Sequence, residues 1–169
     1  MDDNVLKNLI FIEDDDLDYE MYSSIVSSLY PNIKTIQYDH VPENLDKLYR
    51  KEETLILLDL SISGRDGLQV YFEKIRPLQF MTYVHSSSDN PSDWQKCIEF
   101  GIAAYFSKQT GNDNIKKQLQ CIIGFYEMNL IKFGNPINGP EKYLTQIDDQ
   151  KKLIEKLRVE VSNLRKNKN

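Results

Sequence analysis

Residues 54–67, TLILLDLSISGRDG, limit what this chain can fold into more than any other part of its sequence. The apolar run at residues 55–58 stops abruptly at Asp59 and is followed by a turn-rich segment. A run this short and apolar is typical of a strand buried on both faces of a parallel sheet. Because open α/β sheets bind ligands at the carboxyl ends of their strands, we expect Asp59 to face a ligand. Taken alone, Asp59 is equally compatible with capping the loop or the helix that follows.

The same alternation recurs along the first 130 residues. Short apolar runs predict four more strands, at residues 9–12, 33–38, 80–85 and 102–107. Helical patterns span residues 17–29, 42–48, 67–75, 91–100 and 115–130. Strands that alternate with helices in this way predict a doubly wound α/β fold with a five-stranded parallel sheet.

Several apolar residues of these helices are expected to face the core. Trp94 and Ile98 are predicted to face inward, with a partner surface as the alternative for Trp94. The remaining residues with helical spacing are Leu17, Met21, Ile25, Leu29, Leu45, Leu48, Leu68, Phe72, Ile115, Leu119, Ile122, Ile123, Tyr126 and Leu130. Cys97 and Cys121 lack the spacing of metal ligands, and we interpret both as buried thiols of a cytoplasmic protein.

The charge of −5 is unevenly divided between the two ends of the chain. Residues 1–140 hold 13 Lys and Arg against 21 Asp and Glu, a balance of −8, whereas residues 141–169 hold 8 against 5, a balance of +3. An acidic body repels nucleic-acid phosphates, so we expect no nucleic-acid binding by this part. No apolar stretch is long enough for a membrane span or a secretory signal, which also favours the cytoplasm.

The C-terminal part of the sequence differs in composition and in hydrophobic pattern. Residues 134–140, GNPINGP, break any helix and predict a linker between a domain at 1–133 and a helical tail at 141–169. In a heptad assignment of the tail, the a positions are Ile147, Ile154 and Val161, and the d positions are Tyr143, Gln150, Leu157 and Leu164. β-Branched residues at a with Leu at d favour a parallel, dimeric coiled coil. The alternative is a single helix that packs its apolar stripe on the α/β domain.

Chemically active side chains follow four of the predicted strands. Glu13 and Asp14 follow the first strand, Asp59 the third, Ser86 the fourth and Lys108 the fifth. Since the carboxyl ends of parallel strands converge at one edge, we expect these side chains to meet there. Clustered carboxylates repel one another unless a cation neutralises them, and their hard oxygens favour Mg²⁺. A carboxylate nucleophile, a hard metal, a hydroxyl and a lysine together suit phosphoryl transfer.

In these motifs and their order the chain resembles the response-regulator receiver domains of two-component signalling. The resemblance covers about residues 7–131 and rests on FIEDD, LLDLSISGRDG, SSSDNP and AAYFSK. It implies a flavodoxin-like sheet of strand order 2-1-3-4-5 with five helices, to which the C-terminal helix is added. Three positions depart from the family pattern. Glu13 stands where the family more often has aspartate, and Gln109 and Ser63 stand where it often has proline.

The resemblance also implies a role for each matching residue. Asp59 is expected to accept a phosphoryl group from a histidine kinase or a phosphotransfer protein. Lys108 is expected to pair with the phosphate, Ser86 to hydrogen-bond it, and Tyr105 to turn inward as the switch aromatic. The expected Mg²⁺ ligands are Glu13, Asp14, Asp59 and the backbone carbonyl of Ser61.

Other polar residues near these motifs receive plainer interpretations. Asp15, Asp16 and Asp18 are expected to be acids of a first helical turn, favoured by the helix dipole. His40 and His85 have no ligand partners at useful spacing and are predicted to have no function.

Two functions follow from the sequence. In the favoured one the chain is a single-domain response regulator that acts through protein contacts, with no catalysis beyond its own phosphorylation and dephosphorylation. A homodimer through residues 141–169 and a downstream protein partner are both compatible with it. The alternative is a receiver-fold scaffold that assembles through the tail independently of phosphorylation.

Overall fold

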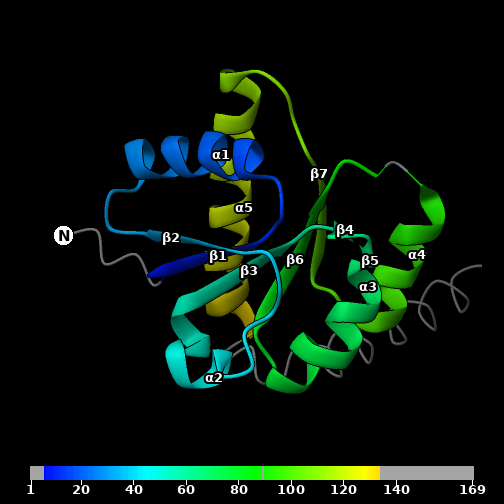
Figure 1. The fold of residues 1–169 in the computed structure, drawn as a ribbon. Helices are drawn as coiled ribbons and strands as arrows, with labels where there is room; N and C mark the ends of the chain where they lie inside the picture. Colours follow the sequence, from blue (N-terminus) through cyan, green and yellow to red (C-terminus); the bar gives the residue numbers. More distant parts are fainter. Residues whose placement is uncertain (1–5, 89, 134–169) are drawn as a thin grey trace, which may run out of the picture.

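The computed structural model describes residues 6–88 and 90–133 of the chain (Figure 1). The strands are β1 (Asn8–Ile12), β2 (Lys34–Tyr38), β3 (Thr54–Leu58), β4 (Ser61–Ile62), β5 (Arg65–Asp66), β6 (Met81–Ser86) and β7 (Ala104–Ser107). The helices are α1 (Asp16–Leu29), α2 (Leu45–Leu48), α3 (Gly67–Val70), α4 (Pro91–Phe100) and α5 (Asn112–Phe133), with short helical turns η1 (Lys51–Glu53), η2 (Tyr71–Ile75) and η3 (Arg76–Leu78). The predicted linker at 134–140 and tail at 141–169, with its coiled coil, lie outside the described residues.

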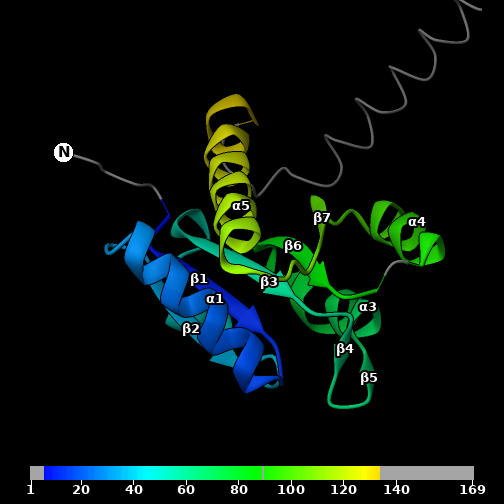
Figure 2. The same cartoon turned by 90° about the horizontal axis from the view of Figure 1, so that it is seen from above.

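Five strands form one parallel sheet in the order β2-β1-β3-β6-β7. Because β4 and β5 pair only with each other, as a small antiparallel hairpin, this order corresponds to the expected 2-1-3-4-5. The flavodoxin-like doubly wound fold is therefore confirmed. Figure 2 shows the β4–β5 hairpin projecting from the sheet beyond β3.

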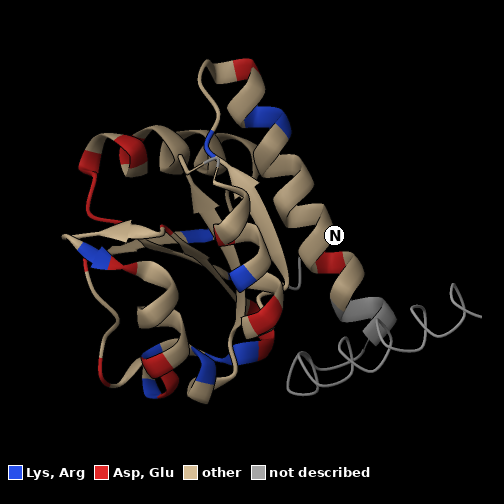
Figure 3. Cartoon of the chain, turned by 90° about the vertical axis from the view of Figure 1, so that its right-hand side faces the viewer, with Lys and Arg blue, Asp and Glu red and all other residues tan. Residues whose placement is uncertain are grey.

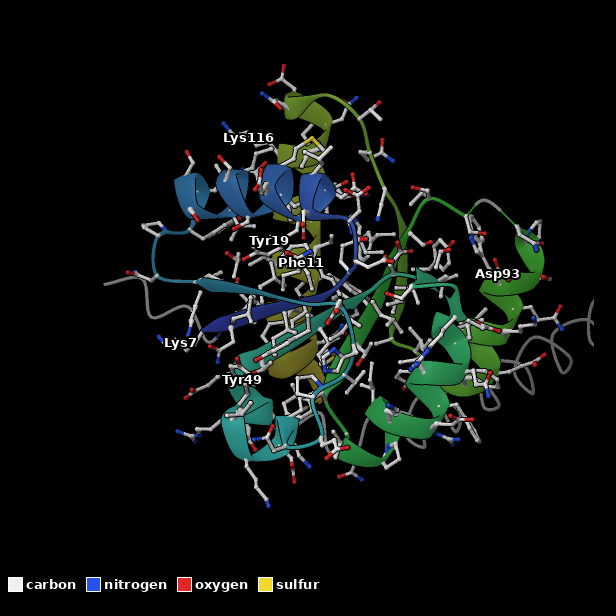
Figure 4. The ribbon with its side chains drawn as sticks, in the orientation of Figure 1. Lys7, Phe11, Tyr19, Tyr49, Asp93 and Lys116 are labelled. Atoms are coloured by element: carbon white, nitrogen blue, oxygen red, sulfur yellow. The ribbon has the colours of Figure 1, made fainter. Side chains whose placement is uncertain are left out.

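The sheet lies between two helical layers, with α1 and α5 on one face and α2, α3 and α4 on the other (Figures 1 and 2). Alternate residues of the central strands supply the two cores, as the period of two in a strand requires. Phe11 and Leu57 pack under α1 and α5, whereas Ile12 and Leu58 pack under α2, α3 and α4. Figure 4 shows Phe11 next to Tyr19 of α1, and their rings meet edge to face at 5.6 Å.

The predicted inward faces of two helices need correction. On α1, Leu17 is 77% exposed, whereas Met21 and Ile25 are partly buried against the core as expected. The fully buried residues of α1 are Tyr22 and Val26, so the centre of its buried face is rotated from the predicted stripe. On α4, both Trp94 and Ile98 are largely exposed, and Cys97 is the buried residue of this helix. The polar residues around them do not mark which side of so short a helix meets the sheet.

Smaller corrections concern three more apolar side chains and a thiol. Leu48 and Phe72 are about half exposed, whereas their neighbours Leu45 and Leu68 are buried as expected. Cys121 is exposed because α5 turns Leu119 and Ile122 toward the sheet in its place. Within the described residues, no helix is long and apolar enough to cross a membrane.

Candidate functional site

The candidate site lies at the carboxyl ends of the parallel strands, where the predicted residues are brought to one rim. The backbone continues the strand pairing there, since Asp59 N donates to Ile12 O at 3.0 Å and Lys108 N donates to Ser86 O at 2.9 Å. These bonds fix where each side chain leaves the sheet. The rim encloses a cavity of about 500 Å³ that is lined by Glu13, Asp14, Asp15, Asp18, Asp59, Leu60, Ser61, Ser86, Ser87, Ser88, Asp93 and Lys108.

Lys108 is the centre of the site. Its Nζ lies 2.5 Å from Glu13 Oε2, 2.7 Å from Asp18 Oδ2 and 3.0 Å from Asp59 Oδ2, and its side chain is 9% exposed. Burial disfavours the ammonium, but the hydrogen bonds that it donates to Asp18, Glu13 and Asp59 outweigh this effect and raise the lysine pKa. Burial raises the pKa of the Glu13 carboxyl, and the nearby Lys108 offsets part of that shift. The ammonium therefore supplies the positive charge that this group of carboxylates requires.

Asp14 does not bind Lys108, and its hydrogen-bond partner is Ser63 of the β4–β5 hairpin. Its Oδ2 accepts a hydrogen bond from Ser63 N at 2.7 Å and another from Ser63 Oγ at 3.3 Å. Ser63 and Gly64 both have positive φ, at 47° and 73°, as a two-residue hairpin turn requires. As the side chains lie, no three acidic, histidine or cysteine residues in the described ranges come close enough to hold a metal ion.

The donor set nevertheless fits a hard cation. The carboxylates of Glu13, Asp14 and Asp59 line one cavity with Ser61, and oxygen ligands of this kind suit Mg²⁺. Asp59 Oδ1 already accepts a hydrogen bond from Ser61 N at 3.2 Å, which keeps the Ser61 backbone beside the carboxylate. These four groups are the residues that would hold the ion.

Gly67 brings helix α3 against the backbone of Asp59. Gly67 N donates to Leu60 O at 2.8 Å, and a Cβ on Gly67 would lie 2.2 Å from the carbonyl oxygen of Asp59. No side chain fits into that space, so glycine is required here for close backbone approach. Asp66 caps the same helix by accepting a hydrogen bond from Leu68 N.

The predicted switch residues lie on the side of the cavity next to α4. Ser86 is buried, and its Oγ accepts a weak hydrogen bond from Ser88 N at 3.4 Å. The Tyr105 hydroxyl donates to Ser88 O at 2.5 Å, and its ring lies 5.5 Å from that of Trp94. Asp93, at the start of α4 (Figure 4), accepts a hydrogen bond from Ser88 Oγ at 2.7 Å. Tyr105 is thus bonded to the loop before α4 and not to Ser86.

The contact of Asp18 with Lys108 is not predicted by the sequence patterns. Asp15 does cap α1, because its side chain accepts hydrogen bonds from Leu17 N and Asp18 N. Asp18, however, is more than a first-turn acid, since it binds the Lys108 ammonium directly. The two residues are 90 positions apart, so no local pattern in the sequence signalled this contact.

His85 and its surroundings form a second feature without a clear sequence signal. His85 is buried, its Nε2 lies 3.2 Å from Gln118 Oε1, and burial lowers its pKa to about 4. The Tyr22 ring meets it edge to face at 4.5 Å. A neutral histidine is therefore packed beside the Lys108 segment (residues 107–109).

Comparison with known proteins gives one family. A family model described as the response regulator receiver domain matches residues 9–120, about two thirds of the chain. No curated protein matches the sequence.

Solved structures of similar fold agree with that match. The phosphorylated cyanobacterial phytochrome response regulator RcpA has a TM-score of 0.57 and 20% identity over 72% of this chain and 94% of its own. The Mn²⁺-bound form of response regulator Rcp1 has a TM-score of 0.53 and 21% identity over 71% and 94%. A response regulator receiver domain from Rhodospirillum rubrum has a TM-score of 0.58 and 16% identity over 72% and 94%.

Proposed function

The chain belongs to the family of response regulator receiver domains, and we propose that Asp59 is the residue that accepts its phosphoryl group. Membership gives the chain a role in phosphorylation-dependent signalling. The observation that supports Asp59 is its distance of 3.0 Å from the Lys108 ammonium, in a cavity that it shares with Ser86. Asp59 is also the acid at the carboxyl end of the central strand β3.

In the proposed reaction, an Asp59 carboxylate oxygen attacks the phosphorus of a phosphohistidine on a histidine kinase or a phosphotransfer protein. The P–N bond breaks, its electron pair stays on the imidazole nitrogen, which takes up a proton, and an acyl phosphate remains on Asp59. Lys108 pairs with a phosphoryl oxygen, and the Ser86 hydroxyl donates a hydrogen bond to another. Hydrolysis of the acyl phosphate by water returns the carboxylate.

Mg²⁺ is the proposed cofactor, held by Glu13, Asp14, Asp59 and the carbonyl of Ser61. When bound, it neutralises charge on the phosphoryl oxygens. To hold the ion, Glu13 would give up its bond to Lys108, and Asp14 would give up its bonds to Ser63. The buried Glu13 carboxylate would then have the cation as its positive partner in place of the ammonium.

The proposed output is a change at the surface of α4 and β7. When Ser86 turns to the phosphoryl group, Tyr105 leaves Ser88 and turns inward, which alters the exposed surface around Trp94 and Ile98. A downstream protein that distinguishes the two arrangements shifts their populations. The domain is proposed to span 1–133, with the linker at 134–140 and a tail at 141–169 that forms a homodimer or binds a partner.

The test uses beryllofluoride with Mg²⁺ as a stable substitute for the phosphoryl group. Trp94 is the single tryptophan of the chain and lies against Tyr105, so its fluorescence should change on addition. Asp59→Asn should abolish the change, whereas Asp46→Asn, on exposed α2, should keep it. A response that survives Asp59→Asn would defeat the proposal.

The scaffold alternative is tested by mass in solution. The full chain and a chain ending at residue 133 are each measured with and without beryllofluoride and Mg²⁺. Mass that depends on beryllofluoride supports the phosphorylation switch. Mass that depends on the tail alone, together with an unchanged Trp94 signal, supports a scaffold.

A further inference from the structure

Helix α1 contacts the Lys108 segment at two points, one helical turn apart. Asp18 binds the ammonium of Lys108 at 2.7 Å, and Tyr22 binds the backbone of the next residue, Gln109. The Tyr22 hydroxyl accepts a hydrogen bond from Gln109 N at 3.0 Å and lies 3.3 Å from Gln109 O. Since residues four apart share one face of a helix, a single face of α1 contacts both the head and the backbone of this segment.

Helix α5 holds the residue on the other side of Lys108. Gln118 Nε2 donates to the carbonyl oxygen of Ser107 at 2.5 Å, and Gln118 Oε1 lies 3.3 Å from the Tyr22 hydroxyl. The same amide oxygen lies 3.2 Å from His85 Nε2, so Gln118 is itself fixed in orientation. Tyr22 and His85 are almost completely buried, so these hydrogen bonds are partly shielded from water, although Gln109 itself is exposed.

The backbone is thus bound by side chains immediately before and immediately after Lys108. We propose that Tyr22 and Gln118 are positioning residues for Lys108, which keep its ammonium within reach of Asp59 and of the phosphoryl group that Asp59 accepts. The inference rests on the proposed role of Asp59. Lys108 has a long and flexible side chain, and its reach is set by where its backbone lies. Small displacements of a catalytic group cost rate because the reacting geometry is lost.

The first test compares two tyrosines that each lose one hydroxyl. Tyr22→Phe removes the bonds to Gln109. The control is Tyr126, which lies on α5 and does not line the cavity; Tyr126→Phe removes a hydrogen bond of 2.9 Å to Glu52 O. Both tyrosines are buried, so a loss of stability alone affects the two variants alike. We expect Tyr22→Phe to slow phosphorylation by phosphoramidate with Mg²⁺ about tenfold, and Tyr126→Phe to leave the rate unchanged. Gln118→Met, which removes the bond to Ser107, should act in the same direction as Tyr22→Phe.

The second test asks whether the effect passes through Lys108. In a double-mutant cycle, Tyr22→Phe is made in the Lys108→Ala background and the same rate is measured. If Tyr22 acts by placing Lys108, the second substitution should change the residual rate less than about twofold. A purely structural role would slow both backgrounds equally.

Each result decides the proposal. A wild-type rate in Tyr22→Phe, an equal loss in Tyr126→Phe, or an undiminished effect in the Lys108→Ala background overturns the positioning role alone. A wild-type chain that takes up no phosphoryl group from phosphoramidate overturns the proposed function and this inference with it.

Discussion

The side of the cavity formed by α1 and α5 and the side formed by α4 differ in how their side chains are held. On the first side, the Lys108 ammonium meets three carboxylates, and its neighbours in the chain are bound by Tyr22 and Gln118. On the second side, Cys97 is the buried residue of α4, and Trp94 and Ile98 are about half exposed. Charge differs as well, because α1 carries acidic residues and no Lys or Arg, whereas α4 and α5 carry both signs (Figure 3).

Under the proposed function, this difference separates the residues that meet the phosphoryl group from the surface that signals. Groups that must meet a phosphoryl group gain from being fixed in advance, since less has to be ordered during the reaction. A surface that must change its shape gains from weak packing, because few buried contacts have to be broken. The four predictions below test whether stability follows this division.

The largest effect is expected for Lys108→Met. Removing the ammonium leaves buried Glu13 and Asp59 without their counter-charge, and we expect a loss of about 3–5 kcal/mol in the free energy of unfolding at pH 7. Urea unfolding in the presence of a chelator measures it. The control Lys116→Met, on the outside of α5 (Figure 4), should change stability by less than about 0.5 kcal/mol. A loss below about 1 kcal/mol in Lys108→Met would remove the basis of the comparison.

Acid should lower the free energy of unfolding because His85, on the same side of the cavity, is protonated more readily in the unfolded chain. Its pKa falls from 6.5 to about 4 on folding because of burial, so between these values the unfolded chain binds a proton that the folded chain does not. Stability therefore falls as pH drops from 6.5 toward 4, by about 2 kcal/mol at pH 4.5 from this residue. In His85→Gln, which lacks the titrating group, the loss of stability between pH 7 and 4.5 should be smaller by the part that His85 contributes. His40→Gln, at the exposed end of β2, should retain it, and equal pH profiles for the two variants would contradict the assignment.

Two tyrosine hydroxyls allow a direct comparison of the two sides. Tyr105→Phe removes a bond to Ser88 O at a partly buried position, which water can reach to replace the partner, and should cost less than about 1 kcal/mol. Tyr22→Phe removes bonds at a buried position and should cost about 1–2 kcal/mol. Thermal unfolding of both variants ranks them. A larger loss for Tyr105→Phe would reverse the comparison.

The smallest effect is expected on the outer face of α4. Ile98→Ala should change the free energy of unfolding by less than about 0.5 kcal/mol, because 60% of this side chain is already exposed. Ile115→Ala, at a fully buried position of α5, should cost about 2–5 kcal/mol. The pair is measured by urea unfolding, and comparable losses would show that α4 is packed as firmly as α5.

The sheet and the rim of the site could be predicted because each depends on patterns short enough to see in the sequence. The run at residues 55–58 ends at Asp59, and β3 ends at Leu58, one residue before it. Helix α4 begins at Pro91 and ends at Phe100 as predicted, since Asn90 caps its start and Gly101 its end. Local signals of this kind do not depend on the rest of the fold.

Other features depend on partners far away in the chain. The contact of Asp18 with Lys108 joins residues that are 90 positions apart, and no local pattern contains it. The β4–β5 hairpin has strands of two residues each, which are too short to show a period. The inward residue of α4 is a cysteine beside a more hydrophobic tryptophan, so hydrophobicity pointed to the wrong face. The metal-ligand and switch roles remain predictions, because they concern bound states.

Gly67 couples the position of helix α3 to the position of the Asp59 backbone. Helix α3 begins so close to the carbonyl of Asp59 that no atom can be inserted between them, and Gly67 N is also bonded to Leu60 O. The start of the helix and the end of the strand that carries Asp59 are therefore expected to move together. A molecule that binds and tilts α3 from outside would displace Asp59, the proposed phosphoacceptor, without any contact inside the cavity.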